Sequence, residues 1–296
     1  MPTHNRPERL QRAAQSILTQ GLAAIELVIV DDASDDHTPD VTERLATDPR
    51  VTVVRNEQSC GPSGARNRGM RAASGSLLGF CDDDDTWMPD AAAILVDSLE
   101  ADPELGAVTS WHRVTHDDSG RGVEYRGPSH FDAADLLWFN FMPLVFGIMR
   151  RSHFPDDLSF DERFTTCEDW DLWLRCARIR PIGVVPQALY TYHQHGKVRV
   201  TTTGSAPTGG RQLFLDKYAA SMSPACRIYH RAVIAQQAEG RSAALAELAT
   251  SGVHQPTAAA SAGLLLAASY GAATVGIRRS DPGLPARVAY RLLAHG

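Results

Sequence analysis

The sequence predicts an α/β protein with a mostly parallel sheet flanked by helices, followed by a helical C-terminal extension. In the first half of the chain, short apolar runs alternate with amphipathic segments, which is the pattern of βαβ units. Two of these runs end abruptly in carboxylates, at Asp31–Asp32 and at Asp82–Asp85. After residue 200, a stretch rich in Thr, Gly, Ser and Pro leads into an Ala-rich segment with a helical pattern.

The elements of the first half are expected in the order of βαβ units. Pro7 near the first turn and Gly21 as a stop bound the first helix. The following patterns alternate along the chain: strands at 27–30, 51–54 and 77–81, and helices at 38–46, 65–74 and 90–102. Such units begin with a strand, but the chain starts at Met1, Pro2 and Thr3, so the first strand is expected to be missing.

The second half of the chain is less regular. Residues 112–130 are polar and rich in Gly, Asp and Arg, and we expect an irregular loop there. Apolar order returns at 136–141 and 144–149, a helix is expected from Glu168 to about Ile179, and strands at 182–185 and 189–192. The expected organisation is an α/β domain over 1–200, a linker over 201–210 and a helical extension over 211–296.

Composition restricts the class of protein. A chain of 296 residues with 43% hydrophobic and 22% charged residues is typical of a soluble globular protein. The net charge of −6 and the absence of a basic stripe argue against a nucleic-acid partner. Five scattered cysteines predict reduced thiols, and the polar amino terminus lacks the apolar stretch of a signal peptide. We therefore expect a cytoplasmic protein.

An uncharged segment near the carboxyl terminus raises the question of membrane contact. Residues 257–277 carry no charge and precede Arg278 and Arg279. Their Ala, Ser and Gly content is too weakly apolar for a confident membrane span. Helical packing against the main domain or a partner is the favoured interpretation, and peripheral contact with the inner face of the membrane is the alternative.

The four consecutive aspartates at 82–85 predict a cation site. They follow an apolar run and are closed off by Thr86, Trp87, Met88 and Pro89. Packing four like charges costs free energy unless a cation or strong donors offset the repulsion. Carboxylate oxygens select Mg²⁺ or Mn²⁺ over zinc. A solvated acidic turn is the alternative interpretation.

Four motifs in order make the sequence resemble a family 2 glycosyltransferase of the GT-A fold. Residues 2–6 are similar to the family's opening loop, and 30–35 to its first acidic loop. Residues 80–87 resemble its metal motif, and Glu168–Trp173 its catalytic helix. The resemblance covers about residues 1–200, and the missing first strand is the departure from it. It implies inverting, metal-dependent transfer of a sugar from a nucleotide sugar to an acceptor hydroxyl.

The resemblance also implies a role for individual residues. Asp169 is implied as the general base, with Glu168 orienting the base or the acceptor. A carboxylate at the end of a strand accepts the imino N–H of uracil or thymine, so Asp32 favours a UDP- or dTDP-sugar. The implied metal ligands for Mn²⁺ or Mg²⁺ are Asp84, Asp82 and His195. The implied nucleotide-binding residues are Thr3, His4, Asp32, Arg66, Asp82 and Asp83.

Other functions and structural roles remain open at this stage. The acids at 31–35 and at 168–169 also suit helix capping and the helix dipole. A sugar nucleotidyltransferase is an alternative enzyme, although residues 2–7 lack its glycine-rich phosphate loop. A truncated sugar-nucleotide-binding protein with little activity is the non-enzymatic alternative. We expect the unknown acceptor to contact residues 112–130 and the C-terminal helices, because loops and extensions carry such variation.

Overall fold

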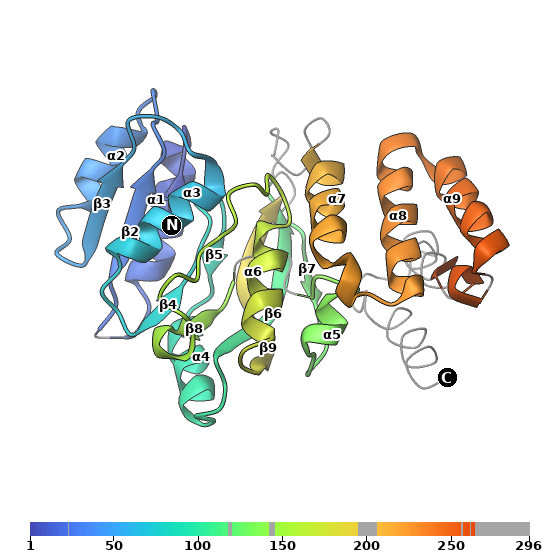
Figure 1. Ribbon diagram of the computed structural model, residues 1–296. Coiled ribbons are helices and arrows are strands. Elements are labelled where there is room, and N and C mark those ends of the chain that lie inside the picture. The colour runs from blue at the N-terminus through green and yellow to red at the C-terminus, as the bar shows by residue number, and fades with distance from the viewer. Residues whose placement is uncertain are drawn as a thin grey trace.

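The computed structural model describes residues 1–22, 24–117, 120–141, 146–194, 206–255, 257–260 and 262–263. His195 and most of the uncharged segment 257–277 lie outside these residues. Among the residues that the structure describes, no helix has the length and apolar character needed to cross a bilayer. Figure 1 shows two sheets flanked by helices, with the C-terminal helices in a row beside them.

The first sheet is parallel throughout, as expected for βαβ units. Its strand order is β1 (Pro2–Thr3), β2 (Leu27–Asp31), β3 (Val51–Arg55). The accompanying helices are α1 (Pro7–Leu18), α2 (Thr38–Leu45) and α3 (Gly61–Ala72). The expectation that the first strand is missing is wrong, because Pro2 and Thr3 pair with Val30 and Asp31 of β2. This two-residue strand places Thr3 at the carboxyl edge of the sheet.

The second sheet is mixed, so the prediction of a mostly parallel sheet holds only for the first one. Its order is β4 (Leu77–Gly79), β8 (Ile148–Arg150), β6 (Ala107–His116), β9 (Ile182–Gln194) and β5 (Thr86–Trp87), with β7 (Gly122–Tyr125) paired to β6. Only the β6–β9 pair is parallel. Helix α4 (Ala91–Glu100) packs against β6 and β9.

Two regions of the second sheet differ from the sequence prediction. The irregular loop expected at 112–130 contains the end of β6 and all of β7, which form an antiparallel pair. The strand was hidden because, from Ser110 to the end of β6 at His116, only Val114 is buried, and most of its neighbours are polar. The two strands expected at 182–192 are one strand, β9, whose pairing with β6 shifts register between Val185 and Ala188. A bulge accommodates the intervening Pro186.

The C-terminal helices pack on the α/β part of the molecule. They are α7 (Ala206–Tyr218), α8 (Pro224–Glu239) and α9 (Arg241–His254). Phe214 of α7 stacks on Trp170 of α6 (Glu168–Ala177) with ring centroids 4.2 Å apart, and both belong to one buried cluster with Phe80 of the second sheet's loop. Helix α7 begins at Ala206, inside the expected linker, so that connection was predicted too long. The domain boundaries stay a prediction.

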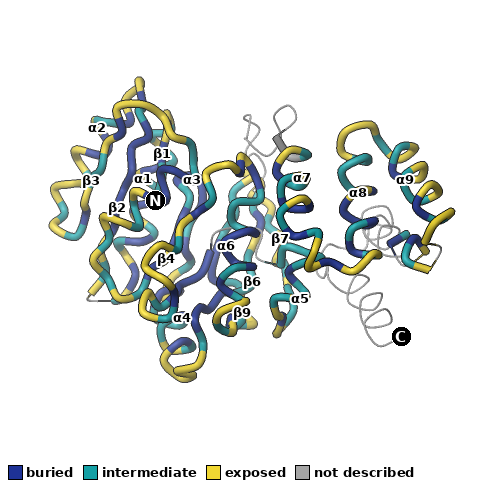
Figure 2. The backbone as a smooth tube through the Cα atoms, in the orientation of Figure 1, coloured by how far each residue is buried: buried dark blue, intermediate teal, exposed yellow. Residues whose placement is uncertain are grey.

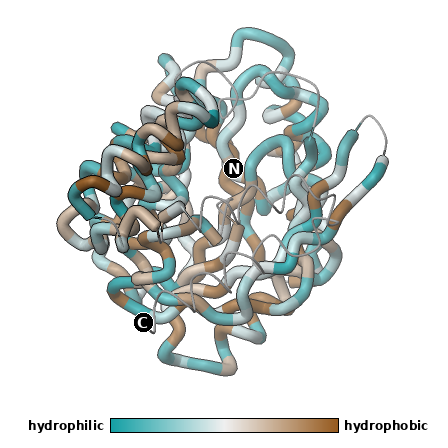
Figure 3. The backbone as a smooth tube through the Cα atoms, turned by 90° about the vertical axis from the view of Figure 1, so that its right-hand side faces the viewer, coloured by the Kyte–Doolittle hydropathy of each residue, from teal (hydrophilic) through white to brown (hydrophobic). Residues whose placement is uncertain are grey.

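Burial and hydropathy follow this packing. Figure 2 shows the buried segments concentrated in the strands, in α6 and on the inner sides of α7 and α8. Figure 3 views the molecule from the side of the C-terminal helices, where hydrophilic and hydrophobic residues are interspersed along the tube. Leu245 and Val253 of α9 are exposed.

Helix α7 lies in close contact with the backbone of the loop that leads into α6. A Cβ added at Gly210 would lie 2.2 Å from the backbone oxygen and from the hydroxyl of Thr166, two residues before α6. A Cβ added at the neighbouring Gly209 would meet nothing within 4 Å. Gly210 therefore sets how closely α7 packs against the loop that enters α6.

We predict opposite effects for alanine at these two adjacent positions. Gly210→Ala forces α7 away from Thr166 and lowers the free energy of unfolding by about 1–3 kcal/mol, the usual cost of overpacking. Gly209→Ala removes a flexible residue from a helix and raises it by up to about 1 kcal/mol. Urea denaturation measures the free energy of unfolding of both variants. Equal changes in the two would show that Gly210 has room for a side chain next to Thr166.

Candidate functional site

The described residues of the predicted site line one cavity. The cavity has a volume of about 830 Å³ and lies between the carboxyl edge of the first sheet, the aspartate loop at 82–85 and helix α6. The predicted residues that line it are Thr3, His4, Asp32, Arg66, Asp82, Asp83, Asp84, Glu168 and Asp169. His195 lies outside the described residues. Asp84 and Asp169, which are distant in sequence, therefore face a shared space.

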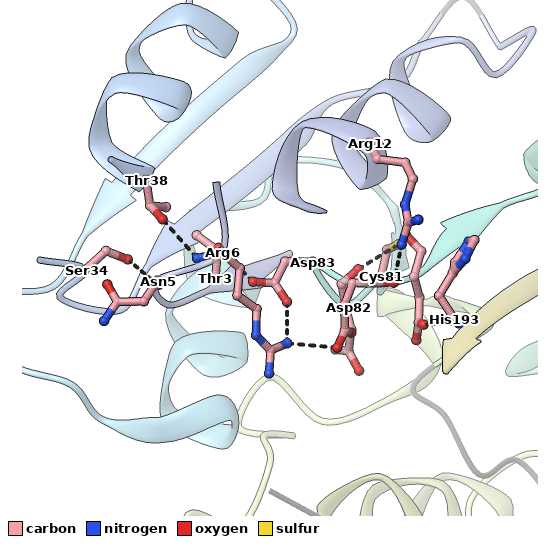
Figure 4. Close-up of polar contacts among 12 residues, drawn as sticks. Thr3, Asn5, Arg6, Arg12, Ser34, Thr38, Cys81, Asp82, Asp83 and His193 are labelled. Atoms are coloured by element: carbon pink, nitrogen blue, oxygen red, sulfur yellow. Dashed lines mark hydrogen bonds and ion pairs between the residues drawn. The ribbon is translucent and has the colours of Figure 1, made fainter. Parts of the chain in front are cut away.

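Arg6 fixes two of the four aspartates. Its Nη1 donates to Asp83 Oδ1 at 2.9 Å, as Figure 4 shows. The same nitrogen donates to Asp84 Oδ2, also at 2.9 Å. The Thr3 hydroxyl donates to the other oxygen of Asp83 at 2.8 Å. The backbone N–H of Arg6 donates to the Thr38 hydroxyl at 3.0 Å, which anchors the opening loop to the start of α2.

Asp85 has a structural role. The Tyr190 hydroxyl donates to Asp85 Oδ2, and the backbone N–H of His193 donates to Oδ1 at 2.9 Å. These bonds connect the aspartate loop to β9. Burial and repulsion from Asp84 raise the pKa of Asp85 well above its usual range. Burial likewise raises the pKa of Asp83 to about 6, because it outweighs the attraction of Arg6.

Arg66 joins the aspartate loop to α6. Its Nη2 donates to Asp82 Oδ1 at 2.6 Å, and its Nη1 donates to Glu168 Oε1 at 2.9 Å. The guanidinium is buried and lies 5.5 Å from the centre of the Phe160 ring. Burial opposes its charge, but the two carboxylates outweigh that effect and raise the pKa of Arg66. A buried arginine at this place keeps two acidic segments together.

Asp32 holds the loop that leads into α3. Its carboxylate accepts from the backbone N–H groups of Cys60 and Gly61 at 2.9 Å, and from the side chains of Ser59 and Asn56 at 2.7 and 2.6 Å. These donors outweigh burial and lower the pKa of Asp32. Asp32 also lines the cavity. Of the capping alternative at 31–35, the turn is present, because the backbone N–H of Ser34 donates to Asp31 Oδ1 at 2.9 Å, whereas the N-cap residue of α2, His37, makes no side-chain capping bond. In the described part of the chain, His4 makes no hydrogen bond to a carboxylate. Its Nδ1 donates to the backbone oxygen of Asp32 at 2.8 Å.

Asp169 is half-buried at the first turn of α6. Its Oδ1 accepts from the backbone N–H of Trp170 at 2.7 Å, and its Oδ2 accepts from the Asn140 amide at 3.3 Å. Burial first, and then repulsion from Glu168, raise the pKa of Asp169 to about 7. A carboxylate with such a pKa is suited to proton transfer near neutral pH.

The remaining side chains at the start of α6 hold the helix in place. Trp170 Nε1 donates to the backbone oxygen of Leu136 at 2.6 Å. Asp171, which is fully buried, contacts Lys217 Nζ and the Tyr218 hydroxyl of α7, each at 2.6 Å. Cys167, immediately before the helix, has a left-handed backbone with φ of 66°. Left-handed conformation at a residue other than glycine is strained and often found at functional sites.

Several lining residues were not predicted as site residues from the sequence. They are Arg6, His112, Asn140, Arg211 and Gln237. Arg6 lies in the opening loop that the sequence identified, so its closeness to Thr3 was a usable signal. His112 and Asn140 lie in weakly patterned segments, and Arg211 and Gln237 belong to helices expected outside the main domain, which gave no such signal.

The residues at the aspartate loop fit a hard divalent cation. Seven carboxylates and three arginines line the cavity, so negative charge is in excess. The raised pKa values of Asp83 and Asp85 report this crowding. Within the described part of the chain, no three His, Cys, Asp or Glu side chains are already grouped as a metal site. Asp82 and Asp84 offer oxygen ligands of the type that Mg²⁺ and Mn²⁺ prefer.

The fold and this acidic cavity define the class of protein as a GT-A type α/β protein. The structure of S. aureus TarS in complex with UDP-GlcNAc has a TM-score of 0.62 and 19% identity, over 81% of this chain and 72% of that one. The mannosyltransferase PcManGT from Pyrobaculum calidifontis, in complex with GDP-Man and Mn²⁺, has a TM-score of 0.51 and 20% identity, over 100% and 77% of the two chains. At 19% and 20% sequence identity, these structural similarities establish the fold of the chain.

The family follows from the sequence comparison. A family model described as glycosyl transferase family 2 matches residues 1–155, more than half of the 296 residues. The chain therefore belongs to glycosyl transferase family 2. This confirms the resemblance and the expected class of enzyme, a glycosyltransferase.

The sequence similarity to curated relatives covers more of the chain than the family model does. The succinoglycan biosynthesis protein ExoO of Rhizobium meliloti is 30% identical over 213 residues, which cover 64% of this chain and 58% of that protein. The uncharacterized glycosyltransferase YwdF of Bacillus subtilis is 27% identical over 225 residues, 73% of this chain and 80% of that protein. The chain thus spans between about a quarter and four fifths of the first five curated relatives.

We predict that removing the Arg66 charge strongly destabilises the protein. Arg66→Met leaves Asp82 and Glu168 without their buried partner, and the free energy of unfolding falls by about 3–5 kcal/mol. The control is Arg68→Met on the same helix, because Arg68 is exposed and its Nη1 donates to the neutral side chain of Asn56. The control costs less than about 1 kcal/mol. Urea denaturation compares the two, and similar losses would argue against a stabilising Arg66 bridge.

Proposed function

We propose that the protein transfers a sugar, with inversion, from a UDP- or dTDP-sugar to an acceptor hydroxyl, using a divalent metal and Asp169 as general base. The observation that carries this proposal is the shared cavity of Asp84 and Asp169, which come from segments far apart in the chain. Family membership supports the reaction class. TarS with UDP-GlcNAc and PcManGT with GDP-Man support a nucleotide-sugar donor.

The aspartate loop is the proposed place of the metal. Asp84 and Asp82 are the proposed ligands, and His195 the third. When bound, Mn²⁺ or Mg²⁺ neutralises the charge that develops on the leaving nucleoside diphosphate. Arg6 and Arg66 hold these carboxylates at 2.6 to 2.9 Å, so the loop keeps its shape before a donor arrives. The structure of PcManGT contains Mn²⁺, and this supports the proposal that a protein of this fold binds a metal.

The nucleoside is proposed to bind near the first sheet. Thr3, His4 and Asp32 line that end of the cavity. Asp32 is ionised at neutral pH because its donors lower its pKa. Four donors already occupy its two oxygens, so the imino N–H of the base would replace one of them, for which the Ser59 hydroxyl is the proposed candidate. The same carboxylate holds the 56–61 loop, which gives that loop a fixed position beside the base.

Asp169 is the proposed base on the opposite side. It takes the proton of the acceptor hydroxyl as the oxygen attacks the anomeric carbon and the bond to the diphosphate breaks. Asn140 and the backbone N–H of Trp170 orient its two oxygens. Glu168 cannot swing freely, because Arg66 holds it at 2.9 Å. We therefore assign Glu168 to positioning rather than to proton transfer.

Asp169→Asn is expected to abolish transfer while preserving donor binding. An amide keeps the size of the side chain but accepts no proton, so sugar transfer and donor hydrolysis fall by about a hundredfold or more. Affinity for UDP with Mn²⁺ stays within about twofold. The control is Asp157→Asn, an exposed surface carboxylate. Transfer by Asp169→Asn at the parental rate would rule out the base assignment.

The pH dependence of activity provides a second test of Asp169. Its pKa of about 7 means that it is mostly protonated below that pH and then accepts no proton. We expect kcat/KM for donor hydrolysis to fall about tenfold per pH unit below 7 and to level off above it. In Asp169→Asn, the residual kcat/KM no longer falls as the pH drops below 7. A parental profile that is flat between pH 5 and 8 would contradict the assignment.

Asp84→Ala is expected to abolish the metal dependence of UDP binding. Calorimetric titration with UDP, with and without Mn²⁺, measures this effect directly. The control is Asp157→Ala, an exposed carboxylate that does not line the cavity. Manganese-dependent UDP affinity that survives in Asp84→Ala would remove the metal assignment.

A further inference from the structure

Arg211 differs from the other two arginines that line the cavity. Arg6 and Arg66 are held by carboxylates at 2.6 to 2.9 Å. Among the described residues, no aspartate or glutamate lies within ion-pair distance of the Arg211 guanidinium, and its recorded partners are an imidazole and an aromatic ring. Arg211 therefore places a positive charge on the cavity wall. Among the described residues, no acidic side chain pairs with this charge.

The partners of Arg211 orient its guanidinium without cancelling its charge. The guanidinium carbon lies 5.1 Å from the centre of the Trp170 ring, and Nη1 donates to His230 Nδ1 at 3.3 Å. His230 Nε2 carries the proton, because it donates to the backbone oxygen of Leu137 at 2.8 Å. Burial, and then the charge of Arg211, lower the pKa of His230 to about 3, so the ring stays neutral.

The position of Arg211 places this charge on the acceptor side of the proposed site. Arg211 lies on α7 and stacks on Trp170, the residue that follows Asp169. The aspartate loop is instead contacted by Arg6 and Arg66. Gln237 of α8 lines the same cavity and adds a neutral polar group. A charged group of a ligand bound by Arg211 would thus lie on the wall formed by α6, α7 and α8.

We propose that Arg211 binds an oxyanion of the acceptor, so that the acceptor is a hydroxyl compound carrying a phosphate or a carboxylate. This inference rests on the proposed function, because it assigns the acceptor half of the same cavity. A guanidinium forms two parallel hydrogen bonds with either group, and the contacts with Trp170 and His230 orient Arg211 for them. The C-terminal helices then take part in recognising the acceptor as well as in packing.

A binding experiment tests the charge requirement directly. Three probes differ only at C6: methyl glucoside 6-phosphate, methyl glucuronide and methyl glucoside. Each is titrated by saturation-transfer NMR into the protein saturated with UDP and Mg²⁺, so that the nucleotide already occupies its own place. We expect at least one charged probe to bind about tenfold more tightly than methyl glucoside, and the tighter of the two identifies phosphate or carboxylate. Equal affinity for all three probes would overturn the proposal.

Variants assign that affinity to Arg211. Arg211→Gln is expected to lower the affinity for the charged probe about tenfold, whereas Arg211→Lys retains part of it. The control is Arg178→Gln, since Arg178 also stacks on an aromatic ring, that of Tyr218, but does not line the cavity. Unchanged binding in Arg211→Gln, or an equal loss in Arg178→Gln, would overturn the proposal.

Two further measurements separate this proposal from the proposed function. Affinity for UDP falls less than twofold in Arg211→Gln if the guanidinium serves the acceptor. A tenfold loss of UDP affinity would assign Arg211 to the donor diphosphate and overturn the inference. If the parental protein neither binds nor hydrolyses a nucleotide sugar, the proposed function fails, whereas titration of the charged probes without nucleotide still reports on Arg211.

Discussion

The site depends on keeping many carboxylates close together in a partly buried place. Left alone, such carboxylates repel one another and resist desolvation, and they would either take up protons or push the chain apart. Arg6 offsets this repulsion between Asp83 and Asp84 of one loop, and Arg66 bridges Asp82 and Glu168 from different segments, at 2.6 to 2.9 Å. At Asp85, hydrogen bonds from a tyrosine hydroxyl and a backbone N–H offset the repulsion and the burial. The positions of the opening loop, α3, β9 and α6 all follow from these pairings.

Much of the first half could be predicted from the sequence because its signals are local. An apolar run ending in acids marks a buried strand that reaches an edge, and Leu27–Asp31 is such a strand. The motifs around Asp82 and Asp169 predicted residues that indeed line one cavity. The partners of these acids were less predictable. That Arg66 pairs with Asp82 and Glu168 depends on how three separate segments fold together, which no spacing along the chain encodes.

The second half was harder to predict for reasons of packing. Strand β6 alternates buried and exposed residues only weakly beyond Ser110, and β9 carries a proline at its bulge, so both depart from the simple strand pattern. Helix α7 begins in a segment rich in Gly and Thr, where propensity argues against a helix. Tertiary contacts override that propensity: Asp171 pairs with Lys217, and Phe214 stacks on Trp170. These contacts make α7 part of the cavity wall.

The two sheets meet without a shared ladder in the described part of the chain. They are joined by apolar packing of α1 against β5 and by polar bonds such as Thr3 to Asp83 and Arg66 to Glu168. Backbone ladders resist shear strongly, whereas packed side chains slide and ion pairs exchange partners. One buried apolar cluster nevertheless crosses the seam, with Ile29 from the first sheet and Val108 and Ile148 from the second. Side-chain packing rather than a backbone ladder therefore fixes how the two sheets lie against each other.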